Sequence, residues 1–194
     1  MKDISIVNQG LQIAISNRYK SPGHALQLYI TIQYLNDPTS EADTFYIKEA
    51  NPSVICHKED LLLVRTGNTG MVVIDVEGVF HNNFFKVNYN NRKVERNFLV
   101  HHLRSPEIQT LIRIYAGATT IPDLNHRDFY RLPFSCPPNS EQSIIAEILN
   151  KVEGNILSEV TYKKKLIEVK IALMQDLLTG KVRVNPDKPK DTPS

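Results

Sequence analysis

The chain has 194 residues, of which 41% are hydrophobic and 23% are charged, and these are ordinary values for a protein that buries a core. The formal net charge of +2 neither requires nor excludes a nucleic-acid partner, because a basic face can occur within a balanced total. The length allows one domain with an appendage, or two small domains. No run approaches the ~18 apolar residues that span a bilayer, and we expect no signal peptide, so we expect a cytoplasmic protein.

The first two thirds of the chain favour short strands followed by two helices. The strand candidates are β-branched and aromatic runs bounded by Gly, Pro, Asn or Asp, at residues 26–35, 44–47, 53–56, 61–65, 71–76 and 83–89. Helices are predicted at 95–103 and 105–115, with Ser105 as the N-cap of the second. Three prolines, Pro133, Pro137 and Pro138, then interrupt regular structure, and we interpret residues 131–139 as a linker.

From Ser140 the pattern becomes helical over about 40 residues, or about 60 Å at 1.5 Å per residue. Asn139 or Ser140 can cap its start, and Gly180 suits the position after its end. A domain of about 139 residues is too small to carry such a helix along its surface, so we expect the helix to project and to pair with a partner helix. The side chains that we expect at that interface are Ile145, Leu149, Val152, Ile156, Val160, Ile167, Met174 and Leu178.

The sequence lacks the patterns of several enzyme classes. No GxxxxGK[ST] phosphate loop and no GxGxxG cofactor loop is present. Glu168-Val169-Lys170 matches the Glu-x-Lys segment of some nuclease active sites, but it lies within the helical pattern, where such triplets arise by chance. The six histidines show no metal-binding spacing, and Cys56 and Cys136 form no CxxC pair, so we expect two reduced, buried thiols. We therefore expect no catalytic residue, no metal and no cofactor.

Three polar clusters in the first part are candidates for DNA contact. Residues 17–20 (Asn-Arg-Tyr-Lys) combine cations with an aromatic ring, which suits phosphate contact, although a plain surface loop is equally consistent. Residues 65–70 (Arg-Thr-Gly-Asn-Thr-Gly) join two strand candidates, so a structural hairpin turn competes with a DNA-reading loop. Residues 81–86 contain two adjacent amides that could read adenine or could satisfy buried backbone groups. The candidate DNA-binding residues are Arg18, Lys20, Arg65, Asn68, Thr69, Asn82, Asn83 and Lys86.

Over nearly its whole length the chain resembles the specificity subunit of type I restriction-modification enzymes, in a half-length form with one target-recognition domain and one conserved-region helix. The most similar stretches are residues 63–70 (LVRTGNTG), 78–85 (GVFHNNFF), 119–125 (TTIPDLN), 137–142 (PPNSEQ) and 173–181 (LMQDLLTGK).

The resemblance implies an α+β fold with a curved mixed sheet and short helices, followed by the long coiled-coil-type helix. It implies a DNA target-recognition domain at residues 1–139, a helix for dimerisation and methyltransferase binding at 140–180, and a flexible tail at 181–194. The family's usual subunit carries two domains and two antiparallel helices, and reads two halves of a split DNA target.

The family also implies a function without catalysis by this chain. The chain would direct adenine methylation or cleavage by methyltransferase and endonuclease subunits. Because one domain and one helix are present, we expect two copies to pair their helices as a homodimer. An alternative is an assembly or dimerisation module, decayed or split, without useful DNA affinity. An endonuclease in its own right would instead cleave DNA as an isolated chain with a metal.

Overall fold

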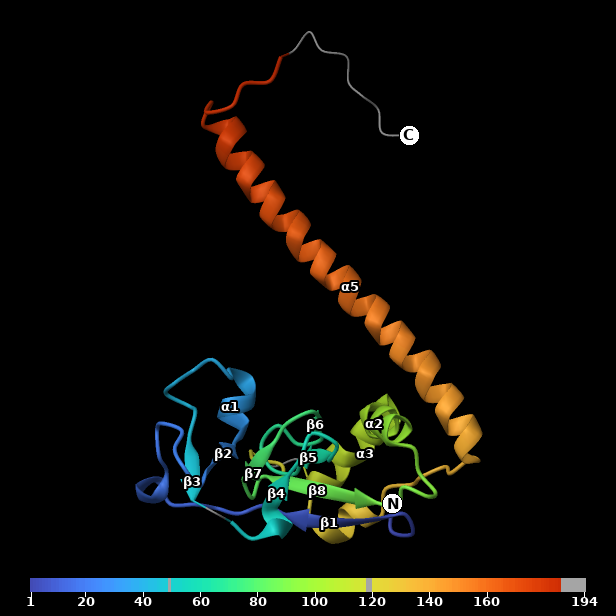
Figure 1. Ribbon diagram of the computed structural model, residues 1–194. Coiled ribbons are helices and arrows are strands. Elements are labelled where there is room, and N and C mark those ends of the chain that lie inside the picture. Colours follow the sequence, from blue (N-terminus) through green and yellow to red (C-terminus); the bar gives the residue numbers. More distant parts are fainter. Residues whose placement is uncertain (49, 118–119, 186–194) are drawn as a thin grey trace. The chain divides into compact units, whose positions relative to one another are not determined.

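The computed structural model describes residues 1–48, 50–117 and 120–185, and its internal contacts divide the chain into two units, Met1–Ala146 and Glu147–Ser194. Strands and short helices make up the first unit, and most of the long helix α5 makes up the second (Figure 1). The α+β class predicted from the sequence is confirmed, although the strands divide between two sheets.

Each sheet has four strands. One sheet is antiparallel throughout, and its strand order is β1 (Ser5–Gln9), β8 (Phe84–Tyr89), β5 (Leu62–Val64) and β6 (Val72–Val73). The other sheet is mixed, because β2 and β7 run parallel, and its order is β3 (Tyr46–Lys48), β2 (Leu26–Ile30), β7 (Gly78–Phe80) and β4 (Ile55–Cys56). Consecutive strands β7 and β8 belong to different sheets, so the short turn at residues 81–83 connects the two.

Each of the six predicted strand regions contains a strand, but the one at residues 26–35 ends early. Strand β2 stops at Ile30, and helix α1 (Ile32–Asn36) follows. The Oγ1 atom of Thr31 accepts a hydrogen bond from the backbone N–H of Tyr34 at 3.1 Å, which caps that helix. The prediction of strand up to residue 35 is therefore wrong, because a local cap outweighs the β propensity of the run.

The predicted pair of helices is confirmed as α2 (Arg96–Arg104) and α3 (Pro106–Ala116). The side chain of Glu95 caps α2, and the side chain of Ser105 caps α3 as expected. Helix α4 (His126–Tyr130) was not predicted, because five residues are too few to show a helical period.

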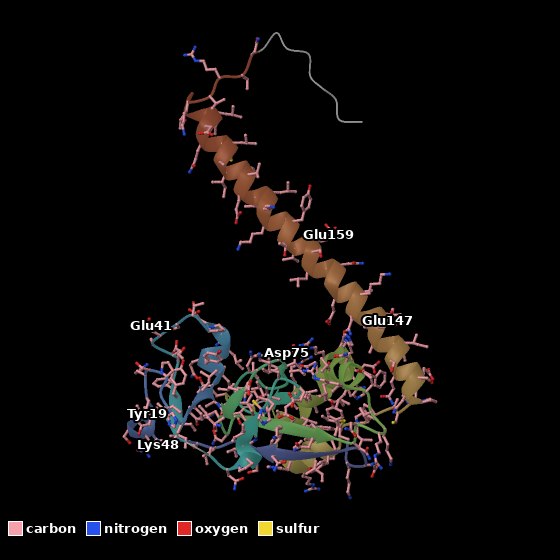
Figure 2. The ribbon with its side chains drawn as sticks, viewed as in Figure 1. Tyr19, Glu41, Lys48, Asp75, Glu147 and Glu159 are labelled. Atoms are coloured by element: carbon pink, nitrogen blue, oxygen red, sulfur yellow. The ribbon has the colours of Figure 1, made fainter. Side chains whose placement is uncertain are left out.

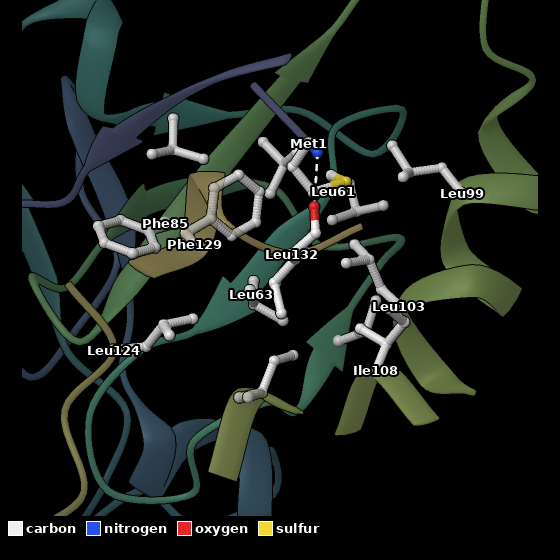
Figure 3. Packing of buried hydrophobic residues seen from close by; sticks show 14 of the residues in the cluster. Met1, Leu61, Leu63, Phe85, Leu99, Leu103, Ile108, Leu124, Phe129 and Leu132 are labelled. Atoms are coloured by element: carbon white, nitrogen blue, oxygen red, sulfur yellow. Dashed lines mark hydrogen bonds between the residues drawn. The ribbon is translucent and has the colours of Figure 1, made fainter. Parts of the chain in front are cut away.

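The largest core cluster fills the space between the antiparallel sheet and helices α2 and α3 (Figure 3). Leu63 and Phe85 of the sheet pack with Leu99 and Leu103 of α2, and all four are fully buried. Burying a side chain of this size stabilises a fold by about 1.5–3 kcal/mol. The core therefore fixes β5 and β8, the two strands from which the candidate site extends.

Helix α5 (Asn139–Leu178) has 40 residues, which confirms the prediction of one long helix. Gln142 and Ala146 are its buried residues, and they lie in the first unit. Between residues 147 and 185 every side chain is exposed except that of Asp176, which is half-buried. Gly180, which follows Thr179 just past the end of the helix, has a φ of +72°, as its predicted place requires. The predicted tail at 181–194 has no helix or strand up to residue 185, and residues 186–194 lie outside the described part of the chain.

The two thiols differ in environment. Cys56 is buried, and this burial raises the pKa of its thiol to about 12. Cys136 is exposed, so the expectation that both thiols are buried is wrong for Cys136. Both cysteines are free.

Candidate nucleic-acid interface

Residues 65–70 form the predicted hairpin turn between β5 and β6. The N–H of Gly70 donates to the carbonyl of Val64 at 2.8 Å and closes the turn. Gly67 and Gly70 have φ values of +91° and +97°, which L side chains rarely adopt. A Cβ atom on Gly70 would also lie 2.7 Å from Oε1 of Gln109. Glycine at these two positions is therefore required by the turn itself.

The turn packs against residues 122–124. The hydroxyl of Thr69 donates to the carbonyl of Pro122 at 2.9 Å, and the hydroxyl of Thr66 donates to the Asp123 carboxylate. The Arg65 guanidinium forms an ion pair of 2.8 Å with the same carboxylate, and only 14% of the Arg65 side chain is exposed. The polar groups of Arg65 and Thr69 thus hold residues 65–70 and 122–124 together.

The amides of residues 82–83 lie in the turn between β7 and β8. Nδ2 of Asn82 donates to Oε1 of Gln12 at 3.2 Å, whereas Oδ1 of Asn82 is buried and has no hydrogen-bond partner among the described residues. The backbone N–H of Asn83 donates to Nδ1 of His81 at 3.1 Å. Burial, assisted by the positive charge of Arg18, lowers the pKa of His81, so the neutral ring is favoured and its Nδ1 can accept this bond.

The two turns meet at one edge of the antiparallel sheet. Val64 at the end of β5 pairs with Phe84 at the start of β8. The N–H of Arg65 donates to the carbonyl of Asn83 at 2.7 Å, which joins the turns directly. Residues 122–124 complete the same edge, because the N–H of Leu124 donates to the carbonyl of Arg65 at 2.8 Å. Three stretches that are far apart in the sequence therefore form one surface, which we call the motif edge (residues 65–70, 81–83 and 122–124).

Asn68 lies at the tip of the motif edge. Its side chain is exposed, and among the described residues the one acceptor of its Nδ2 atom is the sulfur of Met71, at 3.4 Å. A thioether is a weak acceptor, so this amide can exchange the contact for a better partner at little cost. Of the polar side chains that the sequence singled out in this turn, Asn68 is the least committed to the fold.

Lys86 lies on β8, beyond the motif edge. Its Nζ atom donates to the carbonyl of Ile55 at 2.8 Å and lies 3.6 Å from the carboxylate of Asp60. Only 12% of its side chain is exposed. These contacts connect the two sheets, and they occupy much of the ammonium group's donor capacity.

Arg18 and Lys20 lie in a different part of the unit, beside β3. The Arg18 guanidinium donates two hydrogen bonds, of 3.0 and 2.7 Å, to the carbonyl of Ile13. The ammonium of Lys20 lies 3.8 Å from the centre of the Phe45 ring and donates to the carbonyl of Ala42. Tyr19, between them, lines a cavity of about 310 Å³ together with Lys48 (Figure 2). The candidate residues thus fall into two groups, which the ring of Tyr29 links. The Arg18 guanidinium lies 5.2 Å from the centre of this ring, and the ring centres of Tyr29 and His81 are 5.7 Å apart.

Sequence reasoning missed Asp123 and Gln12, which hold the motif edge together. Asp123 binds both Arg65 and Thr66, and Gln12 binds Asn82. Asp123 lies in one of the stretches that carry the family resemblance, and that was the available signal. Gln12 gave no signal, because its loop has no recognisable pattern.

The apolar residues expected on the long helix are exposed side chains. Leu149, Val152, Ile156, Val160, Ile167, Met174 and Leu178 are each at least 39% exposed, and Ile145, in the first unit, is half-buried. A groove of about 370 Å³ lies further along the helix, lined by Leu166, Leu173, Leu177 and neighbouring residues. Figure 2 shows side chains, including those of Glu147 and Glu159, extending from this helix. Apolar exposure on this scale is typical of a helix that binds other helices.

Charge is distributed unevenly along the second unit's helix. Residues 147–160 have three acidic side chains and one basic side chain, a net charge of −2. Residues 161–178 have four lysines and two acidic side chains, a net charge of +2. An antiparallel copy would therefore place opposite charges side by side, whereas a parallel copy would place like charges together.

Among the described residues, no group of three or more His, Cys, Asp or Glu side chains is arranged to hold a metal ion. No helix in the described ranges has both the length and the apolar character needed to cross a membrane.

Solved structures with similar folds come from type I restriction-modification systems. The chain resembles an S subunit from M. genitalium (TM-score 0.55, 15% identity) and an HsdS subunit from Thermoanaerobacter tengcongensis (TM-score 0.64, 14% identity). It also resembles a chain from a study of complex assembly and conformational transition of the type I R-M system (TM-score 0.60, 15% identity). Each match covers 90% of this chain but only 42–43% of the other chain, so this chain spans less than half the length of these relatives.

The family model that matches is the type I restriction modification DNA specificity domain, and it covers residues 2–169. This range includes the whole motif edge and most of α5. The chain therefore belongs to the type I restriction modification DNA specificity domain family.

Proposed function

We propose that this chain is a sequence-specific DNA-binding subunit that reads one half of a bipartite target and brings partner subunits to it. The observation that carries this proposal is the motif edge, where three stretches typical of the family meet and where the amide of Asn68 is exposed and weakly bound. The chain itself has no catalytic role in this proposal. The assembled complex supplies adenine methylation and endonuclease activity through methyltransferase and endonuclease subunits in the cytoplasm.

In the proposed complex, amides read bases and cations stabilise the reading surface. An asparagine can donate to and accept from the major-groove edge of adenine at the same time. Asn68 is exposed and weakly bound, and Asn82 and Asn83 belong to the turn that the N–H of Arg65 joins to it, so we assign base contacts to these three. Lys20 is exposed, and beside its bonds to the carbonyls of Glu41 and Ala42 its ammonium retains one donor for a phosphate, with Arg18 assisting. Arg65, Thr69 and Lys86 would contact DNA at the borders of this surface.

Two copies are proposed to pair through α5 in antiparallel orientation. The exposed apolar side chains along α5, which we call its apolar stripe, would be buried by a second helix. The change from net negative charge at residues 147–160 to net positive charge at 161–178 favours an antiparallel copy. A register that brings Ile156 opposite Ile167 also brings Glu153 opposite Lys170. Residues 1–139, 140–180 and 181–194 then serve as recognition domain, spacer helix and tail.

The test is methylation mapping in cells. The chain is expressed with a methyltransferase subunit of the same system in a host without other adenine methylation, and modified adenines are located by single-molecule sequencing. We expect one split, palindromic motif, because two identical readers face one duplex. Methylation without sequence preference would overturn the proposal. The methyltransferase subunit expressed alone is the control.

One observation favours a second candidate function, an assembly module without useful DNA affinity. Residues 1–146 contain 14 Lys and Arg against 14 Asp and Glu, so the first unit has no net positive charge to attract phosphates. Light scattering beside DNA-binding measurements separates the two functions. A dimer whose DNA binding is negligible at every salt concentration, even with its partner subunit, would support the assembly module.

A further inference from the structure

Gln142 is a fully buried polar side chain in the first turns of α5, and it binds a different part of the first unit. Its Oε1 atom accepts a hydrogen bond from the N–H of Glu95 at 2.9 Å. Its Nε2 atom donates to the carbonyls of Lys93 at 2.8 Å and Pro137 at 2.7 Å. None of its surface is exposed. This one side chain therefore connects the start of α5, the linker before it and the segment that precedes α2.

Asn139 strengthens the same connection. Its Nδ2 atom donates to the carbonyl of Arg92 at 2.8 Å, three residues before the Glu95 contact of Gln142. Glu95 also caps α2, because its carboxylate accepts a hydrogen bond from the N–H of Phe98. Glu95 therefore binds α2 through its side chain and Gln142 through its backbone N–H. We call these contacts of Gln142 and Asn139 with residues 92–95 the helix joint. All of its atoms lie within Met1–Ala146.

Directional contacts of this kind constrain orientation, whereas an apolar contact at the same place would allow sliding. Each hydrogen bond fixes both a distance and an angle, and a buried amide that rotates leaves its partners without replacement by water. The chain preceding the helix contains Pro137 and Pro138, whose restricted φ angles reduce its freedom further. The first turns of a continuous 40-residue helix are thus held by a defined set of contacts.

We propose that Gln142 is a positioning residue that sets how strictly the protein measures the spacing between the two halves of its DNA target. This inference rests on the proposed function. In a dimer paired through α5, each recognition domain is connected to its spacer helix through the helix joint, and a looser joint accepts half-sites at neighbouring spacings. Gln142 contacts no DNA in this proposal and reads no base.

The experiment compares Gln142→Met with Ser143→Ala in the methylation mapping described above. Methionine has a similar length and removes every hydrogen bond of the amide. Ser143 is the next residue and is exposed, and its hydroxyl donates to the carbonyl of Asn139 within its own helix. For Gln142→Met we expect the same half-site sequences, with methylated sites whose spacer is one base pair longer or shorter. The preference for the original spacer should fall by about tenfold or more, which corresponds to ~1.4 kcal/mol. Ser143→Ala should keep the single spacer.

A merely structural role for Gln142 gives a different result. It would lower the amount of folded protein and the methylation level while leaving a single spacer length, and this outcome overturns the proposal. If Gln142→Met does not fold, the mapping is repeated with Asn139→Ala, which removes one hydrogen bond of the helix joint. A single, unchanged spacer length in that variant would also overturn the proposal. Wild-type chain that yields no split motif at all would refute the proposed function instead, so the two failures are distinguishable.

An independent measurement needs no DNA. Hydrogen exchange of the purified chain should show faster exchange at the Glu95 amide in Gln142→Met, because that N–H loses its acceptor, while amides of β5 and β8 stay protected. Unchanged protection at Glu95 would show that the joint does not depend on Gln142, and it would overturn the inference.

Discussion

In Met1–Ala146 most of the large apolar side chains of the two sheets and helices α2 and α3 are buried, whereas in Glu147–Ser194 every large apolar side chain of the described residues is exposed. The first unit has the contacts of an independently stable domain. The second has an ordered helix that buries none of its described apolar side chains within the unit. The first unit therefore has a core of its own, and the described residues of the second unit have none.

The largest expected effect comes from placing a charge in the apolar stripe of α5. Ile156→Glu should weaken self-association by more than about a thousandfold, because the two copies together lose about 3–6 kcal/mol of burial and each gains a buried charge. Sedimentation velocity measures this. The thermal unfolding of the first unit should not change. Ser158→Glu, which adds the same charge on the opposite face of the helix, is the control. An Ile156→Glu dimer as tight as the wild type would contradict the helix-paired dimer.

A core substitution should give the reverse pattern. Phe85 is fully buried and packs edge-on against Phe129, with ring centres 6.1 Å apart. Phe85→Ala should lower the free energy of unfolding of the first unit by about 3–5 kcal/mol through lost burial and a residual cavity. Urea denaturation monitored by tyrosine fluorescence measures it. Ile114→Ala on the exposed face of α3 is the matched control and should have little effect.

A third pair of variants separates reading from folding within one turn. Asn68→Ala should relax sequence preference by about 1–3 kcal/mol at one base pair and leave stability within about 0.5 kcal/mol, because the side chain is exposed. Thr69→Val should cost about 1 kcal/mol of stability, because its hydroxyl binds the carbonyl of Pro122. Competition binding with single-base variants of the target, beside urea denaturation, measures both. If Asn68→Ala keeps full selectivity, Asn68 is not a base-reading residue.

The smallest effect is a decline in stability at mildly acidic pH. Burial lowers the pKa values of His81, His102 and His126 below the ordinary value near 6.5. The unfolded chain therefore binds protons first, and the free energy of unfolding falls as the pH drops through 6.5. Urea denaturation at pH 7.5 and 5.5 should show this loss, and His81→Asn should reduce it. Equal stability at the two pH values would contradict the assigned histidine environments.

The helical period of α5 and the cap of α3 could be predicted because their signals are local. Ser105 and Pro106 mark the start of α3, and the apolar recurrence after Ser140 marks α5. The end of β2 could not be predicted, because one threonine, Thr31, stops a run that otherwise favours a strand. Strands β1 and β7 depend on pairing with distant partners, and no local pattern reveals such pairing.

The candidate site was predicted as separate clusters, and its geometry was not. The sequence singled out Arg65, Thr69 and Lys86 as residue types suited to DNA, but it could not show that each binds protein groups. Their partners, Asp123, Pro122 and Ile55, are 31–58 residues away in the chain. Which polar group remains uncommitted is a property of the folded surface, and for Asn68 only the structure supplies it.

The contrast between the two thiols has a practical consequence for spectroscopy. Maleimide reagents attack the thiolate, so the exposed Cys136 should be labelled, while the buried Cys56, with a pKa of about 12, should remain unmodified. The sulfur of Cys136 lies 3.7 Å from Nε2 of Gln142. A fluorophore or spin label can therefore be attached to the natural chain at a single place beside the helix joint, and two labels in a paired complex would form a molecular ruler.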